Sequence, residues 1–142
     1  MVDPFPDAFS SFGKRVRQRL RDEKVIWFTT VGGDGTPQPN PVWFLLQGNS
    51  ILIYNRPDAH RLNHVERRPR VSLNLDGNGV GGDIIVVTGE AALDADAPLP
   101  HELPEYMAKY EALMGRVSGS PEGFSKEYPV PLRIAIARIR GF

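Results

Sequence analysis

The 142-residue chain contains no cysteine. This absence excludes a disulfide framework, a catalytic thiol and the sulfur-rich kinds of structural zinc site. The chain also has no excess charge of either sign, because 17 lysines and arginines balance 17 aspartates and glutamates. A balanced charge creates no overall field that would attract nucleic acid or an anionic membrane, so the basic residues matter for binding only where they cluster.

Long hydrophobic runs are absent as well. No apolar stretch approaches the roughly 18 residues that a membrane-spanning helix needs. The first 15 residues carry acid and proline where a signal peptide has a basic start and an apolar core. We therefore expect a soluble, cytoplasmic protein without a membrane partner. Its hydrophobic content of 41% and charged content of 24% are typical of a globular protein, and its length suits one domain.

Hydrophobic periodicity predicts three helices. Residues 10–22 place apolar side chains at three- and four-residue spacing, with Ser10 or Ser11 as the cap. A short helix is expected over residues 58–66, and a second amphipathic helix over residues 104–115. Residues 115–128 are expected to form a loop with at most one helical turn. The sequence thus predicts helices at early, middle and late positions in the chain.

Six strands are predicted from β-branched, aromatic and alternating residues, at positions 24–31, 38–47, 50–55, 71–75, 83–93 and 131–139. Pro39 and Pro41 make the start of the second strand irregular. Most strands are joined by hairpin-length turns, so we expect a mainly β, α+β fold whose antiparallel sheet curls into a barrel with flanking helices. Residues 1–142 would form a single domain, with residues 1–23 as an N-terminal helical region and residues 24–142 as the barrel.

Several motifs are better explained by structure than by chemistry. Gly77, Gly79 and Gly82 match the dinucleotide-binding pattern, but a strand follows them where that pattern requires a helix. His60 and His64 have the spacing of metal ligands but lack a third ligand, so no metal is expected. No serine lies in a hydrolase elbow, and no acidic pair suggests acid–base catalysis.

Two groups of basic residues remain as candidates for binding. The N-terminal helix could bind nucleic acid, although basic residues opposite an apolar stripe more often form a solvated face, so no nucleic-acid partner is expected. Arg56 and Arg61 lie where a strand ends and a helix begins, and there the free backbone N–H groups and the guanidinium groups together would hold a phosphate. The alternative is that these arginines only cover the surface of the barrel.

The stretch from Thr29 to Leu73 resembles the core of the pyridoxamine 5′-phosphate oxidase-like split-barrel proteins, in particular the F-420-dependent branch of the flavin- and deazaflavin-dependent oxidoreductases (class B). The shared pattern is G-x-P-x-x-x-P-V-W-F, a strand ending in a small polar residue, a basic helix and P-R-V-S-L. The later GGDIIVVTGEA and the terminal RIRGF fit as well. The resemblance implies a six-stranded antiparallel split β-barrel of the FMN-binding type. It also implies a homodimer with two cofactor sites in the subunit interface.

The same resemblance implies where a cofactor binds. The flavin or deazaflavin ring would lie against Asn40, Pro41, Val42 and Trp43. Thr29 or Thr30 on the neighbouring strand would supply a hydroxyl group.

The phosphate would be held by Asn55, Arg56 and Arg61. The family's helix commonly reads Lys-x-Arg-Asn, whereas this chain has Arg61 in the lysine position and Asn63 in the position of the second basic residue. Arginine still binds phosphate in a bidentate manner. The loss of the second charge affects the choice between F-420 and flavin mononucleotide (FMN).

From this resemblance we expect an oxidoreductase that transfers a hydride between F-420 and a small electron-poor organic substrate, with FMN as the alternative cofactor. Because the cofactor carries the chemistry, the missing acid–base constellation is no obstacle, and we nominate no catalytic residue. Tyr106, Tyr110 or water would donate a proton to the reduced substrate. The alternative functions are an FMN-dependent oxidoreductase and a non-catalytic carrier of F-420, FMN or haem.

Overall fold

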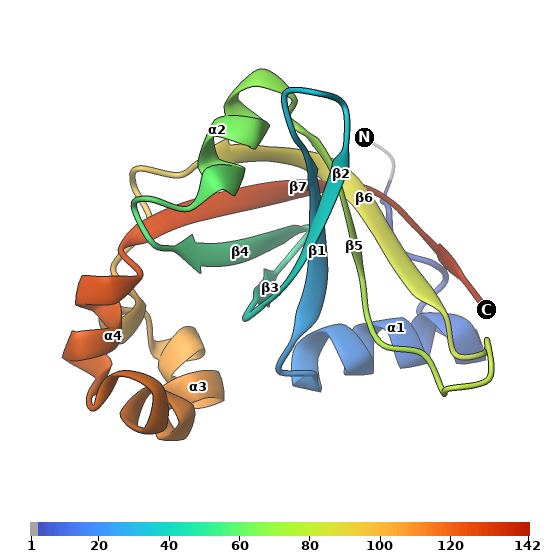
Figure 1. Cartoon of the computed structure of the whole chain (residues 1–142). Coiled ribbons are helices and arrows are strands. Elements are labelled where there is room, and N and C mark those ends of the chain that lie inside the picture. The colour runs from blue at the N-terminus through green and yellow to red at the C-terminus, as the bar shows by residue number, and fades with distance from the viewer. Residues whose placement is uncertain (1–2) are drawn as a thin grey trace.

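A seven-stranded antiparallel sheet that curls into a half-barrel forms the centre of the molecule (Figure 1). The computed structural model describes residues 3–142, so the first two residues of the predicted domain and of its N-terminal region lie outside the described part. The strand order is β2-β1-β5-β6-β7-β4-β3. The strands are β1 (Ile26–Val31), β2 (Pro37–Val42), β3 (Leu45–Gln47), β4 (Ser50–Asn55), β5 (Arg70–Asn74), β6 (Ile85–Leu93) and β7 (Val130–Gly141).

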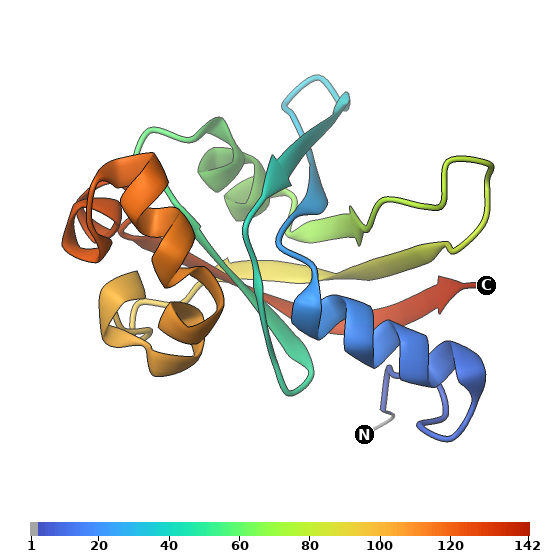
Figure 2. The ribbon, with the colours of Figure 1, turned by 90° about the horizontal axis from the view of Figure 1, so that it is seen from below.

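Four α-helices and one 3₁₀ turn flank this sheet. They are α1 (Ser11–Asp22), α2 (His60–Arg67), η1 (Pro100–Glu102), α3 (Pro104–Ser118) and α4 (Pro121–Glu127). In Figure 1, α1 lies below the curled sheet, α2 lies above it, and α3 and α4 lie together beside β4. The view from below in Figure 2 shows α1 running across the sheet and the pair of α3 and α4 on the other side of the β3–β4 hairpin. In residues 3–142, no helix has the length and apolar character to cross a membrane.

The barrel fold is confirmed, but the prediction of six strands is wrong by one. Residues 38–47 form two strands, because β2 ends at Val42 and β3 begins at Leu45. These two strands are the opposite edges of the sheet. The chain therefore crosses the open side of the half-barrel at Trp43 and Phe44, and this crossing is the split in the barrel.

Helix α3 satisfies the backbone of the crossing in place of a neighbouring strand. Phe44 N donates to the hydroxyl oxygen of Tyr110 at 2.8 Å. The same hydroxyl lies 2.9 Å from Phe44 O and 2.8 Å from Lys24 O, either of which accepts its proton. Lys109 Nζ donates to Phe44 O at 2.8 Å. Because buried backbone groups need partners, these contacts both end β2 and fix α3 against the sheet.

Proline defines the outer edge of β2, but the predicted irregular start is wrong, because β2 pairs with β1 in continuous register from Pro37 to Val42. Gly32 N bonds to Thr36 O at 3.0 Å, and the register then pairs Thr30 with Gln38 and Phe28 with Asn40. In an antiparallel pair, the residues between these positions point their backbone groups away from the partner strand. Those residues in β2 are Pro37, Pro39 and Pro41. The edge consequently offers no N–H group to a further strand, which protects it against aggregation.

Two hydrophobic clusters stabilise the fold. The larger one fills the half-barrel and includes Val16 and Leu20 of α1, which confirms the amphipathic helix predicted over residues 10–22. Ser10 caps this helix by accepting from Gly13 N at 2.9 Å. The second cluster joins β3 and β4 to α3 and α4; its buried members are Leu45, Leu52, Tyr54, Tyr106, Tyr110, Met114 and Phe124.

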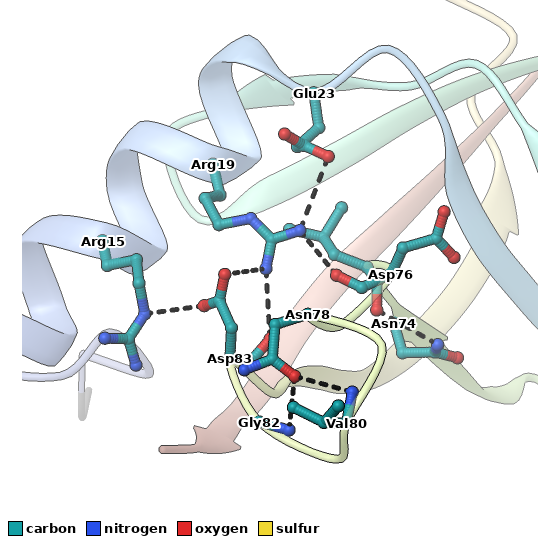
Figure 3. Close-up of polar contacts among 10 residues, drawn as sticks. Arg15, Arg19, Glu23, Asn74, Asp76, Asn78, Val80, Gly82 and Asp83 are labelled. Atoms are coloured by element: carbon teal, nitrogen blue, oxygen red, sulfur yellow. Dashed lines mark hydrogen bonds and ion pairs between the residues drawn. The ribbon is translucent and has the colours of Figure 1, made fainter.

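The glycine-rich loop between β5 and β6 is a hairpin loop, as predicted, and α1 holds its two ends (Figure 3). Arg19 donates to Asp76 O at 2.6 Å and pairs with the Asp83 carboxylate at 3.1 Å. Arg15 pairs with the other oxygen of that carboxylate at 2.9 Å. Asn78 Oδ1 accepts from two backbone N–H groups within the loop. Two of the basic residues of α1 are thus neutralised inside the fold.

The sequence-based prediction for residues 115–128 is wrong. Helix α3 continues to Ser118, and α4 occupies most of the remainder. Ser120 caps α4 by accepting from Gly123 N at 2.9 Å, and Pro121 stands at the first helical position, where its missing N–H has no cost. A register shift between Thr88 and Gly89 of β6 also changes which side chains of β7 point into the core. Ile139 is therefore buried, whereas Arg138 was expected on that face.

Removal of the Tyr110 hydroxyl should destabilise the protein. In Tyr110→Phe the buried Phe44 N–H loses its acceptor, and an unsatisfied buried donor costs about 1–3 kcal/mol. Tyr106→Phe is the matched control, because Tyr106 lies in the same helix and its hydroxyl forms no hydrogen bond to another described residue. Urea unfolding should show the larger loss of stability for Tyr110→Phe; equal losses would mean that the hydroxyl does not hold the crossing.

Candidate functional site

A pocket of about 330 Å³ lies where the β2–β3 crossing, the end of β4 and the helices α3 and α4 meet. Its walls are formed by Pro41, Val42, Trp43, Tyr54, Arg56, Ala59, Arg61, Tyr106, Val117, Phe124 and Tyr128. The end of β2 and the crossing place the first three of these residues, whereas Arg56 lies in the turn after β4 and Arg61 lies in the first turn of α2. The pocket is therefore a product of the split in the barrel.

Aromatic rings form one side of the pocket. Trp43 is parallel to Tyr110 at 4.7 Å and to Phe124 at 5.0 Å between ring centroids. Phe124 in turn stacks on Tyr128 at 4.6 Å. These rings join the crossing to α3 and α4, so the indole of Trp43 is held as part of a wall. Such a wall excludes water and suits a planar, apolar group.

Arg61 brings positive charge into this apolar pocket. Its Nε donates to Asn55 Oδ1. Asn55 is fully buried, and its Nδ2 donates at 3.0 Å both to Ile53 O and to Val130 O. The polar atoms of the Asn55 side chain thus form hydrogen bonds that fix Arg61 and the ends of β4 and β7. The predicted phosphate ligand Asn55 is, by this geometry, a support for Arg61.

The charge of Arg61 has no counter-charge in residues 3–142. None of the ion pairs among the described residues includes Arg61. Burial lowers the pKa of Arg61, because a less solvated site disfavours the charged form. Arginine nevertheless remains charged in proteins. A half-buried cation without a carboxylate partner is best stabilised by an anion that enters the pocket.

Arg56 lies at the rim of the pocket and is already paired. Its guanidinium group binds the Glu127 carboxylate at 3.0 Å and lies 4.9 Å from the centre of the Tyr128 ring. The hydrogen bond to the Tyr128 side chain raises the pKa of Arg56. Since its side chain is 53% exposed, Arg56 would contribute less than Arg61 to the binding of an anion.

The remaining predicted residues lie elsewhere. Thr29 faces a separate hollow of about 760 Å³ on the outer side of the sheet. Thr30 is buried, and its hydroxyl lies 2.8 Å from His64 Nδ1. Asn40 is exposed on the edge strand. The structure therefore brings Pro41, Val42, Trp43, Arg56 and Arg61 to one pocket and leaves Thr29, Thr30 and Asn40 outside it.

Two of the pocket's tyrosines, Tyr54 and Tyr106, and the neighbouring Tyr110 are uncharged at neutral pH. Burial raises the pKa of Tyr54 to about 12, and burial also raises the pKa of Tyr106 and of Tyr110. Tyr54 donates to Pro98 O at 2.6 Å, and Tyr110 donates to Phe44 O or to Lys24 O. Of the two tyrosines predicted as proton donors, Tyr106 is the one that lines the pocket without such a bond among the described residues.

Sequence reasoning missed the part of the wall that α4 contributes. Phe124 and Tyr128 fall in the segment that was expected to be a loop. Two signals were present: the Ser120-Pro121 helix start and the four-residue spacing of the two aromatic residues. The support role of Asn55 had no signal in the sequence, since it depends on Val130 O, 75 residues away.

Other chemistry has little support in residues 3–142. No group of three or more histidine, aspartate or glutamate side chains there could hold a metal ion. His64 is engaged by Thr30. Ser125 Oγ lies 2.7 Å from His101 Nδ1, but Ser125 is buried and also accepts from His101 N, so this contact joins α4 to η1 and offers no reachable nucleophile.

Comparison with known proteins gives a family match for nearly the whole chain. Residues 12–141 match the family model described as pyridoxamine 5′-phosphate oxidase. No match was found among curated proteins.

Solved structures share the fold at low sequence identity. General stress protein 26 of Bacillus anthracis superimposes with a TM-score of 0.67 at 19% identity over 89% of each chain. An F420 reductase superimposes with a TM-score of 0.64 at 20% identity, over 87% of this chain and 94% of that one. HutZ, the heme storage protein of Vibrio cholerae, has a TM-score of 0.62 at 12% identity, over 90% and 92%. At these identities the likeness shows the fold.

Proposed function

The chain belongs to the pyridoxamine 5′-phosphate oxidase family, and from this premise we propose that it is an F-420-dependent oxidoreductase. The observation that carries the proposal is Arg61, a half-buried cation without a carboxylate partner in residues 3–142, set in an aromatic pocket. A cofactor with a planar ring and an anionic tail matches both features. The similarity in fold to an F420 reductase supports the same choice.

The residues of the pocket fit such a cofactor chemically. Arg61 would hold the phosphate, with its guanidinium group oriented in advance by Asn55. The volume of about 330 Å³ is at the lower end of the range for small-molecule sites, which is about 300–1,000 Å³. One chain would thus surround only part of the cofactor, as expected for a site shared between two subunits.

The net charge of the proposed phosphate site favours F-420 over FMN. The phosphate of F-420 is a diester with one negative charge, whereas the phosphate of FMN is a monoester that carries up to two. Arg61 offers one unpaired positive charge, Arg56 is neutralised by Glu127, and Asn63 adds none. Because one cation matches one negative charge, the diester leaves less uncompensated charge in a partly buried site.

In the proposed reaction, the bound cofactor would supply hydride transfer to or from a small electron-poor substrate. The chain itself binds the anionic end at Arg61, excludes water with the wall of Trp43, Phe124 and Tyr128, and orients the ring. Tyr106 would offer its hydroxyl O–H to the substrate; burial raises its pKa, so it holds this proton more tightly than an exposed tyrosine does. No other acid–base group is required of the protein.

We also propose that the protein acts as a homodimer. The hollow of about 760 Å³ on the outer face of the sheet is lined by small residues such as Ser72, Thr88 and Ala137, together with Thr29. A second copy seated there would bury this face. Thr29 would then contact the cofactor held by the other subunit, which accounts for its distance from the pocket of its own chain.

No nucleic-acid or membrane partner forms part of the proposal. In α1, Arg15 and Arg19 pair with Asp83, and Arg21 pairs with Asp22. A cytoplasmic location remains a prediction from the cysteine-free sequence. The second candidate function is a carrier that binds F-420, FMN or haem without turnover. It is favoured by the fold shared with a heme storage protein.

Arg61→Ala should weaken the binding of F-420 by at least tenfold. The loss of a charge-assisted hydrogen bond costs about 1.5–3 kcal/mol, and Arg61 is the unpaired cation of the pocket. Arg56→Ala is the control and should change the dissociation constant less than threefold, because the charge of Arg56 is already paired. Titration calorimetry with F-420 and with FMN measures both effects. An Arg61→Ala affinity within threefold of that of the unmodified protein would contradict the phosphate site.

Turnover separates the oxidoreductase from the carrier. Protein loaded with reduced F-420 should lose the reduced cofactor, by absorbance, when quinones, enones or biliverdin are added as acceptors. The rate should exceed the rate without protein, and Tyr106→Phe should slow turnover more than it weakens binding. Tight binding together with an oxidation rate no faster than the protein-free rate, for every acceptor, would favour the carrier.

A further inference from the structure

A second cavity, a groove of about 800 Å³, lies between α1, β3 and α3. The groove and the aromatic pocket have no lining residue in common. Four cationic residues, Arg17, Arg21, Lys24 and Lys109, line the groove against two acidic ones, Asp22 and Glu105. The cofactor proposal assigns no role to this groove.

Lys109 is the half-buried cation of the groove. Its Nζ donates to Phe44 O at 2.8 Å and lies 3.8 Å from the centre of the Phe44 ring. No ion pair among the described residues includes Lys109. One protein acceptor therefore serves an ammonium group that has three N–H donors. The charged form of Lys109 is poorly compensated, and its amine opens into a groove that small molecules can enter.

Burial, more than the neighbouring charges, favours the neutral form of Lys109. Burial and the neighbouring ammonium of Lys24 lower the pKa of Lys109 to about 8, while Asp22 and Glu23 act in the opposite direction. The Phe44 ring and the Phe44 carbonyl oxygen also favour the charged form of Lys109. The carbonyl oxygen, however, also accepts a hydrogen bond from the neutral amine. The other charged groups of the groove are Arg17 and Arg21 on α1 and Glu105 on α3. The balance leaves an amine that is nucleophilic near neutral pH.

We propose that Lys109 is a site of N-acylation and that the donor is a small acyl phosphate. The excess of cations in the groove attracts the phosphate group. Arg17 is the arginine of the groove without a carboxylate partner among the described residues, and its NH1 donates to Gly13 O at 3.0 Å. Leu45, Leu46 and Ala108 provide apolar surface for a short acyl chain.

The reaction is balanced without any further reactant. The lone pair of the Lys109 amine attacks the acyl carbon, and an N–C bond forms. The C–O bond to phosphate breaks, inorganic phosphate leaves with the electron pair, and the amine proton passes to water. The resulting amide retains one N–H group for Phe44 O but carries no charge. Acylation thus removes the cation beside the crossing without removing its hydrogen bond.

The four lysines of the chain, Lys14, Lys24, Lys109 and Lys126, make the test internally controlled. The purified protein is treated with acetyl phosphate at pH 7.5 and at pH 9.5, and acetylation of each lysine is followed by peptide mass spectrometry. At pH 7.5 about a quarter of an amine with a pKa near 8 is neutral, against about a thousandth of an ordinary lysine. Lys109 should therefore react at least tenfold faster than the exposed Lys14 and Lys126, and this preference should narrow at pH 9.5.

A second reagent tests the identity of the donor. Arg17→Gln should slow the acetylation of Lys109 by acetyl phosphate at least threefold and leave its acetylation by an uncharged N-hydroxysuccinimide ester unchanged. If Lys109 reacts no faster than Lys14 and Lys126 with either reagent, the modification site is wrong. If Arg17→Gln changes the rate of Lys109 acetylation equally for the two reagents, the proposal that the donor is an acyl phosphate is wrong.

Discussion

The contact between the Tyr110 hydroxyl and the Phe44 backbone is the interaction on which the other features depend. It satisfies the chain where it crosses the open side of the half-barrel, and it fixes α3 there. With α3 in place, Trp43 and the rings of α4 form the aromatic wall on one side of the crossing. Lys109, the neighbour of Tyr110 in α3, lies against the Phe44 ring and lines a second cavity. The segment that the Tyr110 hydroxyl holds thus contributes residues to both cavities.

The pocket combines an aromatic wall with a cation that has no carboxylate partner among the described residues. Its aromatic wall lowers the solvation of anything inside, and Arg61 places a charge in that environment without a carboxylate among the described residues. A protein that used Arg61 only for stability would gain more from an ion pair or from an apolar side chain. Asn55 also commits its buried polar atoms to holding Arg61 in one orientation. This is the arrangement expected of a preformed anion site.

Local features could be predicted from the sequence, whereas long-range ones could not. Helix α1 and its Ser10 cap, the hairpin before β2 and the strand nature of residues 83–93 follow from spacing and turn residues near each element. The division of residues 38–47 could not be foreseen, because its cause is a tyrosine 66 residues away. For the site, five of the predicted residues, Pro41, Val42, Trp43, Arg56 and Arg61, line one pocket, whereas Asn55 contacts Arg61 and the contribution of α4 was not predicted. Thr29 has a place in the site only if a second copy is present.

The central claim is that Arg61 binds the anionic end of the cofactor, and side-chain NMR of arginine tests it most directly. The Nε–H group of Arg61 is held by Asn55, and that of Arg133, at 2.7 Å from Asp94, is an equally fixed control away from the pocket. Titration of ¹⁵N-labelled protein with F-420 should shift the Arg61 Nε–H signal and leave the Arg133 signal in place. An Arg61 signal that stays unchanged while F-420 saturates the protein would contradict the account.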